Sequence, residues 1–369
     1  MIDSEELGAW IRLLETPGVG RESARRLLAT FGSPQAVLAA ATSARREVVG
    51  AVAASALAET SAALEQQIQT TLEWLAAETT APRSVIPLGH AHFPPALLHA
   101  ADPPLMLYAQ GRLELLAGEA IAVVGSRNPT RQGTDNARAF SAHLSHAGFT
   151  VVSGLALGID AAAHEGGLEG AASTVAVVGT GLDRVYPKRH LALARRIAEQ
   201  GLIVSEYSLG TPPLPENFPN RNRIIAGLTR GTLVVEAALK SGSLITARLA
   251  SESGRDVFAI PGSIHSPQAR GCHALIKQGA KLVESAQDIL EELNLTGAAS
   301  PIEAAHGELV LEEEDAVLHA LGFDPVTLDA LVARTDWSAA ALNVRLLELE
   351  LNGQIARLPG QLFQRIGSS

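Results

Sequence analysis

Short apolar runs separated by helix-length segments dominate the middle of the chain. Within each run the hydrophobic residues are nearly continuous and do not alternate with polar ones, which predicts strands that are covered on both faces. Such strands, joined by helices, are typical of a parallel sheet with crossover connections. The predicted strands cover residues 121–125, 150–154, 174–179, 202–206, 232–237 and 256–262. The pattern therefore predicts an α/β fold, a doubly wound parallel sheet over 119–295 whose ligands gather at the carboxyl ends of the strands.

The segments before this domain differ in pattern. Apolar residues recur every three or four positions over 1–80, which predicts a small all-α domain. The Gly-Val-Gly sequence at 18–20 suits a helix-hairpin-helix or SAM-like turn in which backbone amides approach a phosphate, although a plain helical hairpin would use the same turn. Five prolines between 86 and 111 then predict a connector over 81–118, with one short strand at 105–109.

The segments after it also form two parts. Acidic and small residues over 296–312 predict a linker. Three amphipathic segments and an alternating stretch that turns at 359–360 predict a winged-helix domain over 313–369. Its expected recognition helix carries only Arg345 against Glu348 and Glu350, which favours a protein contact or a regulatory role over DNA reading.

Charge is distributed unevenly along the 369 residues. The formal net charge of -10 would ordinarily argue against nucleic acid as a partner. Between residues 282 and 333, however, there are twelve acidic residues and no Lys or Arg. The remaining chain is close to neutral, so a locally positive groove is compatible with the composition.

Several function classes are not expected. The single Cys272 cannot form an internal disulfide, and no secretory signal pattern is present at the N-terminus, so we expect a cytoplasmic protein. No apolar segment approaches the roughly 18 residues that span a bilayer, so no membrane is expected as a partner. A dinucleotide site needs G-x-G-x-x-G, and this spacing is missing after Gly125, so no nicotinamide or flavin cofactor is expected.

Small and cationic residues follow the predicted strands and form a candidate phosphate site. Arg127 would present a planar charged group at a strand end, although a structural ion pair with a nearby carboxylate is the alternative for it. Small residues at the other strand ends would expose backbone amides, and a Gly-Ser helix start is a natural anion receiver. The candidate residues are Gly125, Ser126, Arg127, Ser153, Gly154, Lys188, Arg221, Asn222, Arg223, Lys240 and Ser243.

Six motifs carry a family resemblance. They are GSR at 125–127, SGLALGIDAAAH at 153–164, GLDRVYPKRH at 181–190, FPNRNRIIAGL at 218–228, EAALKSGSLITA at 236–247 and IPGSIHSPQARGCHALIKQGAKLV at 260–283. In this order they resemble the DNA processing protein A family, DprA, also called Smf. The helical N-terminal and C-terminal segments fit the same family.

The resemblance implies an extended Rossmann domain that binds single-stranded DNA without catalysis. Members of the family protect incoming single strands during natural transformation and load the RecA recombinase onto them. By motif, the phosphate ligands would be Arg127 and Lys188, and the role is extended to Arg221, Asn222, Arg223 and Ser153. Aromatic residues for base stacking are few, chiefly Tyr186 and Phe218, so backbone contacts should dominate and binding should weaken with salt.

A homodimer is also expected. The segment 281–285 predicts a last strand with an unpaired edge, and self-association commonly covers such an edge. The resemblance places the dimer contact here, at His273, Ile276 and Leu282. No Cys or His stands at ligand spacing from His273, so no metal is expected.

An enzyme remains the alternative. Related extended Rossmann folds include the lysine-decarboxylase-like phosphoribohydrolases, which process nucleotides. Their glycine-rich motif is echoed weakly by GTLVVE at 231–236, where Glu236 would be the catalytic carboxylate. Thr229 and Arg230 replace the glycines that would let the backbone meet a ribose phosphate, so the echo favours common fold ancestry.

Overall fold

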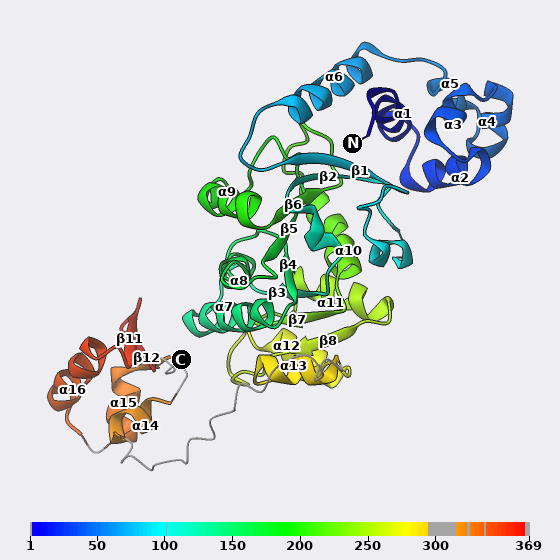
Figure 1. Ribbon diagram of the computed structural model, residues 1–369. Helices are drawn as coiled ribbons and strands as arrows, with labels where there is room; N and C mark the ends of the chain where they lie inside the picture. Colours follow the sequence, from blue (N-terminus) through cyan, green and yellow to red (C-terminus); the bar gives the residue numbers. More distant parts are fainter. Residues whose placement is uncertain (1, 101, 294–314, 323–324, 336, 366–369) are drawn as a thin grey trace. The chain divides into compact units, whose positions relative to one another are not determined.

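The computed structural model describes residues 2–100, 102–293, 315–322, 325–335 and 337–365. The chain forms two compact units, residues 1–297 and 298–369. The first unit contains a helical N-terminal part and a large, mostly parallel sheet covered by helices, so the predicted α/β fold is confirmed (Figure 1). None of the helices in the described ranges has the length and apolar character needed to cross a lipid bilayer.

The N-terminal part is helical over the predicted range. Its apolar faces pack into one core around Leu7, Ile11 and Leu27, which also includes Val85 and Tyr108 of the sheet. Side-chain oxygens of Asp3, Ser33 and Ser61 accept backbone N–H groups at three helix starts and so fix where those helices begin. The helices are α1 (Ser4–Glu15), α2 (Arg21–Phe31), α3 (Pro34–Ala39), α4 (Thr42–Val49), α5 (Ala51–Ala56) and α6 (Ala62–Ala76).

Within the described residues of the first unit, the strands form one nine-stranded sheet. Its order is β1-β2-β6-β5-β4-β3-β7-β8-β9, and the strands from β3 to β9 pair in parallel. The chain runs outward from β3 to β6 and then returns to place β7 beside β3, which makes the β3/β7 boundary the topological switch point. The parallel strands are β3 (Ala120–Val124), β4 (Thr150–Ser153), β5 (Thr174–Val178), β6 (Leu202–Ser205), β7 (Gly231–Val234), β8 (Asp256–Ala259) and β9 (Lys281–Leu282).

Helices cover both faces of this sheet. Residues of α7, α8 and α13 share one core with the strands, α9 packs in a cluster with β5 and β6, and α10, α11 and α12 contribute to the core of the other face. Figure 1 shows α7, α8 and α9 on one side and α10 and α11 on the other. The bounds are α7 (Arg131–His146), α8 (Ile159–Gly167), α9 (Leu191–Gln200), α10 (Asn217–Leu228), α11 (Ser243–Glu252), α12 (Arg270–Lys277) and α13 (Ala286–Glu292).

The Pro-rich segment contributes more to the sheet than the sequence predicts. It forms two strands, β1 (Arg83–Pro87) and β2 (Met106–Gly111), where one short strand at 105–109 is expected. The two strands pair antiparallel with each other, and β2 pairs antiparallel with β6. Proline is tolerated here because Pro87 ends an edge strand and the other prolines lie between the strands. The 3₁₀ turns are η1 (Pro95–His99), η2 (Leu113–Leu116) and η3 (Lys188–His190).

The second unit has the helices and hairpin of a winged helix. Its elements are α14 (Ala316–Leu321), β10 (Val326–Thr327), α15 (Leu328–Arg334), α16 (Ala339–Leu351), β11 (Ile355–Leu358) and β12 (Leu362–Arg365). The hairpin loop covers 359–361, one residue longer than the predicted turn at 359–360, and Gly360 and Gln361 are both in the left-handed region. The predicted linker, 296–312, lies entirely outside the described residues.

Candidate functional site

A groove of about 680 Å³ opens at the switch point of the sheet. One wall follows β3 and contains Gly125, Ser126 and Arg127, and the opposite wall follows β7 and contains Lys240 and Ser243. The first turns of α10 complete it with Phe218, Arg221 and Asn222. The structure thus brings together seven of the eleven predicted ligand residues: Gly125, Ser126, Arg127, Arg221, Asn222, Lys240 and Ser243.

The groove carries an excess of positive charge. Among the described residues that line it, Arg127, Arg221 and Lys240 are cationic, and Asp160 is the one carboxylate. Arg127 and Lys240 are exposed, and no carboxylate of the described residues lies within ion-pair distance of either side chain. The alternative of a structural ion pair for Arg127 therefore finds no partner in the described ranges. These two cations are accessible to a solvent-borne anion.

Two helices direct their N-terminal turns at the same groove. Phe218 and Asn222 belong to the first turns of α10, and Ser243 is the first residue of α11. Gly242, the N-cap of α11, is exposed and offers no capping side chain. A helix N-terminus carries partial positive charge, so both helices favour an anion in the groove. In α11 the first N–H groups, those of Ser243, Leu244 and Ile245, are already hydrogen-bonded to Ser241 and Gly242.

Arg221 is a buried wall residue. It is 5% exposed and donates hydrogen bonds from Nη1 to the carbonyl oxygens of Gly154 (2.7 Å) and Val177. Burial lowers the pKa of Arg221 to about 10, so the guanidinium stays protonated at neutral pH. Its charge contributes to the potential of the groove, and the protein accepts hydrogen bonds from its Nη1, while its buried Nε has no hydrogen-bond partner among the described residues.

Gly154 was expected to expose a backbone amide, but the structure requires a glycine here for packing. A Cβ at this position would overlap the guanidinium of Arg221, so the missing side chain makes room for that arginine. The backbone N–H of Gly154 donates to Oδ2 of Asp160 at 3.1 Å, and Ser153 Oγ donates to the carbonyl of Val123 at 2.7 Å. The structure therefore does not present Ser153 or Gly154 to the groove as donors.

The remaining small residues of the groove also have internal contacts. A Cβ on Gly125 would lie 2.6 Å from Cγ1 of Ile159, so this glycine is needed for packing of α8 against the strand end. Ser126 Oγ accepts the N–H of Asn128 at 3.1 Å, and Ser243 Oγ lies 2.7 Å from Ser241 Oγ. These residues therefore contribute mainly to the shape of the groove.

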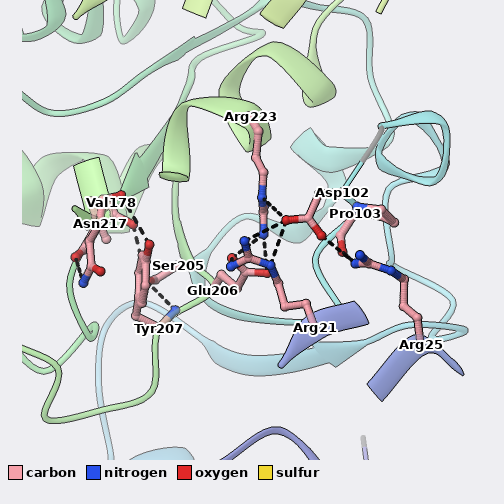
Figure 2. Close-up of polar contacts among 11 residues, drawn as sticks. Arg21, Arg25, Asp102, Pro103, Val178, Ser205, Glu206, Tyr207, Asn217 and Arg223 are labelled. Carbon is pink, nitrogen blue, oxygen red and sulfur yellow. Dashed lines mark hydrogen bonds and ion pairs between the residues drawn. The ribbon is translucent and has the colours of Figure 1, made fainter. Parts of the chain in front are cut away.

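Arg223 faces away from the groove, into an ion-pair cluster. Its Nη2 lies 2.6 Å from Oε2 of Glu206 and its Nε 3.2 Å from Oδ2 of Asp102. Arg21 and Arg25 of α2 also bind Asp102, each at 2.7 Å (Figure 2). Although burial alone would raise the pKa of Asp102, the three guanidinium groups lower it. The structure thus places Arg223 in a contact that joins α2 to the sheet domain and does not bring it to the groove.

The ion-pair cluster also affects the phosphate contact that was predicted at the Gly-Val-Gly turn, residues 18–20. Arg21 and Arg25 follow that turn directly and would be its nearest cations. Both are engaged by Asp102, and Arg21 also lies 3.5 Å from Glu206. A phosphate at this turn would have to compete with two carboxylates.

Lys188 is close in sequence to a groove-lining residue, Tyr186, but does not line the groove itself. It begins the 3₁₀ turn η3 and is exposed, two positions after Tyr186, which does line the groove. Tyr186 and Phe218 stand together there, with ring centroids 5.4 Å apart and an angle of 39° between the rings. Together they offer an apolar surface at one end of the groove.

Asp160, Asn128 and Gln268 are among the lining residues that were not predicted as site residues. Asp160 is buried and accepts the N–H groups of Gly154 and Ala156, which fixes the loop after β4. Asn128 is exposed next to Arg127, and Gln268 donates to the carbonyl of Asn128 at 3.0 Å. Membership of Gln268 in the IPGSIHSPQARG motif is the sequence signal that could have pointed to it.

Comparisons with known proteins give two family matches along the chain. Residues 84–294 match the family described as DNA recombination-mediator protein A, and residues 303–361 match the DprA winged helix domain. Protein Smf of Escherichia coli is 41% identical over 302 residues, 80% of this chain and 80% of that protein. The chain belongs to the DNA recombination-mediator protein A family.

Two solved structures of DprA are similar to this chain. The protein from Streptococcus pneumoniae superposes with a TM-score of 0.68 at 38% identity, covering 77% of this chain and 97% of that one. The protein from Helicobacter pylori, whose structure concerns its single-stranded DNA binding mode, has a TM-score of 0.53 at 30% identity, covering 58% and 96%. The predicted family and fold are therefore confirmed.

In this DprA-family chain Glu236 has a structural position. Its carboxylate accepts the N–H of Thr130 at 2.9 Å and the hydroxyl of Thr130 at 2.6 Å, and Thr130 is the N-cap of α7. A Cβ on Gly133 would overlap the same carboxylate, which shows how closely the helix start surrounds it. A negative charge at a helix N-terminus stabilises that helix. The carboxylate is not among the groove-lining residues, which disfavours the catalytic alternative.

The predicted dimer residues lie at the far edge of the sheet. β9 is the last strand of the order, and Leu282 is exposed on it. Ile276 is half-buried against the core, and His273 Nε2 lies 2.9 Å from the carbonyl oxygen of Gly262. The predicted last strand is present but short, since β9 covers only Lys281–Leu282 of the predicted 281–285, and the homodimer itself remains a prediction.

Proposed function

We propose that this chain binds single-stranded DNA in the switch-point groove. The observation that carries the proposal is the charge of the groove, where three cationic side chains face one buried carboxylate and two helix N-termini. The Helicobacter pylori relative, whose structure concerns a single-stranded DNA binding mode, supports the choice of ligand. Arg127 and Lys240 contact phosphates, and Asn222 donates a hydrogen bond to the sugar-phosphate backbone of the DNA. Lys188 adds a further positive charge beyond the groove.

Binding is proposed to be tolerant of sequence. Phosphates position the strand, since the accessible groups of the groove are a guanidinium, an ammonium and amides. Tyr186, 49% exposed, together with Phe218 provides the one aromatic surface among the described lining residues, and a base stacks there. Stacking accepts any base because every base has a π-face.

The proposed role in the cell is the one that the family resemblance implies. The chain protects single strands that enter during natural transformation and loads the RecA recombinase onto them, as a cytoplasmic homodimer that contacts itself through His273, Ile276 and Leu282. It does so without catalysis and without a cofactor. The engagement of Glu236 at the start of α7 supports the choice of a binding protein over a nucleotide-processing enzyme.

The experiment is a gel-shift titration with labelled oligo-dT. Arg127→Ala and Lys240→Ala are each expected to weaken binding about tenfold, because each removes one accessible cation from the groove. Arg138→Ala is the matched control, since Arg138 is an exposed arginine paired with Glu169 outside the groove. Equal affinities for all four proteins would refute the site. Release of free base from nucleoside monophosphates, lost in Glu236→Gln, would establish the enzyme instead.

A further inference from the structure

Helix α16 has two apolar faces, and only one of them is covered. Leu342, Leu346 and Leu349 are buried in the core of the second unit. Val344, Leu347 and Leu351 are instead 62%, 56% and 79% exposed. With 3.6 residues per turn, these three side chains fall within a sector of about 60° on the side away from the buried leucines. We call Val344, Leu347 and Leu351 the outer stripe.

The outer stripe is not a DNA-reading surface. The recognition helix of a winged helix meets the major groove with cationic and polar side chains. In α16 the one cation is Arg345, whose Nη1 lies 2.6 Å from Glu348 Oε2 and whose Nε lies 2.7 Å from Asp315 Oδ2. Glu348 and Glu350 leave the helix acidic, which repels phosphates.

The charges around the outer stripe define what fits it. On the helix surface Glu348 lies on one side of the stripe, about 40° from Val344, and Glu350 lies on the other side, about 60° from Leu347. An apolar strip bordered by carboxylates on both sides is complementary to an amphipathic helix whose apolar residues are flanked by Lys or Arg. Helices of this kind bind grooves and faces through residues at three- and four-residue spacing.

We propose that the outer stripe of α16 docks a basic amphipathic helix of a partner protein. A second copy of α16 is a poorer occupant, since a two-fold contact would bring the acidic borders of both copies together. The acidic segment 303–314 of this chain is also a poor occupant, because it carries five glutamates and no cation. The proposal does not depend on the DNA groove, and either can fail alone.

The test uses the full chain and a synthetic probe. The probe is a fluorescent peptide of about 18 residues, long enough to form a helix, with Leu at three- and four-residue spacing and Lys elsewhere. One control peptide has the same composition with Leu dispersed, and a second has Glu in place of Lys. Fluorescence anisotropy is expected to give at least tenfold tighter binding of the Leu/Lys peptide than of either control.

Protein variants connect the binding to α16. Leu347→Ser and Leu351→Ser, alone and together, are expected to weaken binding of the Leu/Lys peptide, at least tenfold for the double variant. Val52→Ser, which changes an 81% exposed valine on α5, is the matched control and should stay within twofold of wild type. Because both leucines are exposed, the melting temperature of the variants should match that of the wild type. If it does not, Leu347→Ala and Leu351→Ala replace the serine variants in the binding assay.

Several results would overturn the proposal. Equal binding of the dispersed peptide would mean attraction to net charge alone, and unchanged binding by the double variant would place the contact elsewhere. Sedimentation that shows a wild-type assembly dissociated by Leu347→Ser and Leu351→Ser would make a second copy the occupant. A loss of duplex DNA binding in the same variants would make α16 a DNA contact.

Discussion

His164 makes the stability of the sheet domain depend on pH. The ring is fully buried, and burial lowers its pKa to about 3, helped by the positive charges of Arg221 and His190. Its Nε2 accepts the backbone N–H of Leu155 at 3.2 Å, so Nδ1 carries the proton and donates to Thr174 Oγ1 at 2.7 Å. A second proton on Nε2 would point at the N–H of Leu155. The folded state therefore holds neutral His164, whereas an unfolded chain has a histidine of ordinary pKa near 6.5.

The sign of the effect follows from the lowered pKa. The unfolded state binds the proton first, so stability is fully present above about pH 6.5 and falls progressively down to about pH 3. With these two values His164 alone removes about 2 kcal/mol of unfolding free energy between pH 7 and pH 5. The assay is urea unfolding of wild type and His164→Gln at both pH values. The glutamine variant should be less stable at pH 7 but should lose about 2 kcal/mol less on acidification, and equal losses in the two proteins would refute the reasoning.

Three further predictions concern buried contacts. Gly154→Ala should destabilise the protein by about 1–3 kcal/mol in urea unfolding, because the added methyl meets the buried Arg221 guanidinium. Gly242→Ala is the control and should not destabilise the protein, because the space around Gly242 is open. Equal stabilities of the two variants would contradict the packing argument. Cys272 should react slowly with a thiol reagent in the native protein and rapidly in urea, since burial raises the pKa of its thiol to about 12. Asp102→Asn should lower the melting temperature and make it less sensitive to salt than that of the wild type, because Arg21, Arg25 and Arg223 share that carboxylate.

The sequence predicts where each parallel strand starts to within one residue, but it extends β7, β8 and β9 up to three residues too far. The central parallel strands are buried on both faces, so their hydrophobic runs are continuous and end at small residues. The antiparallel strand β1 (Arg83–Pro87) was missed because it ends in a proline and begins with two polar residues, Arg83 and Ser84. Edge strands tolerate such features, which makes them hard to tell from connectors.

The site could be predicted in position but not in every side chain. The carboxyl ends of parallel strands meet at one edge of a sheet, and this brings Arg127 and Lys240 together from distant motifs. Arg221 and Arg223 are only two residues apart in the sequence, and on a helix this spacing makes them point about 200° from each other. One lines the groove, and the other pairs with Glu206 and Asp102. The geometry of a helix over these residues would alone have separated them.

The most direct test of the central proposal is the salt dependence of binding to oligo-dT. Each phosphate contact to a single strand contributes about 0.7 to the slope of log K against log salt concentration. Contacts from Arg127, Lys240 and Lys188 predict a slope of about -2 for the wild type, and Arg127→Ala should reduce its magnitude by about 0.7 while Arg138→Ala leaves it unchanged. A slope that Arg127→Ala does not alter would contradict the account.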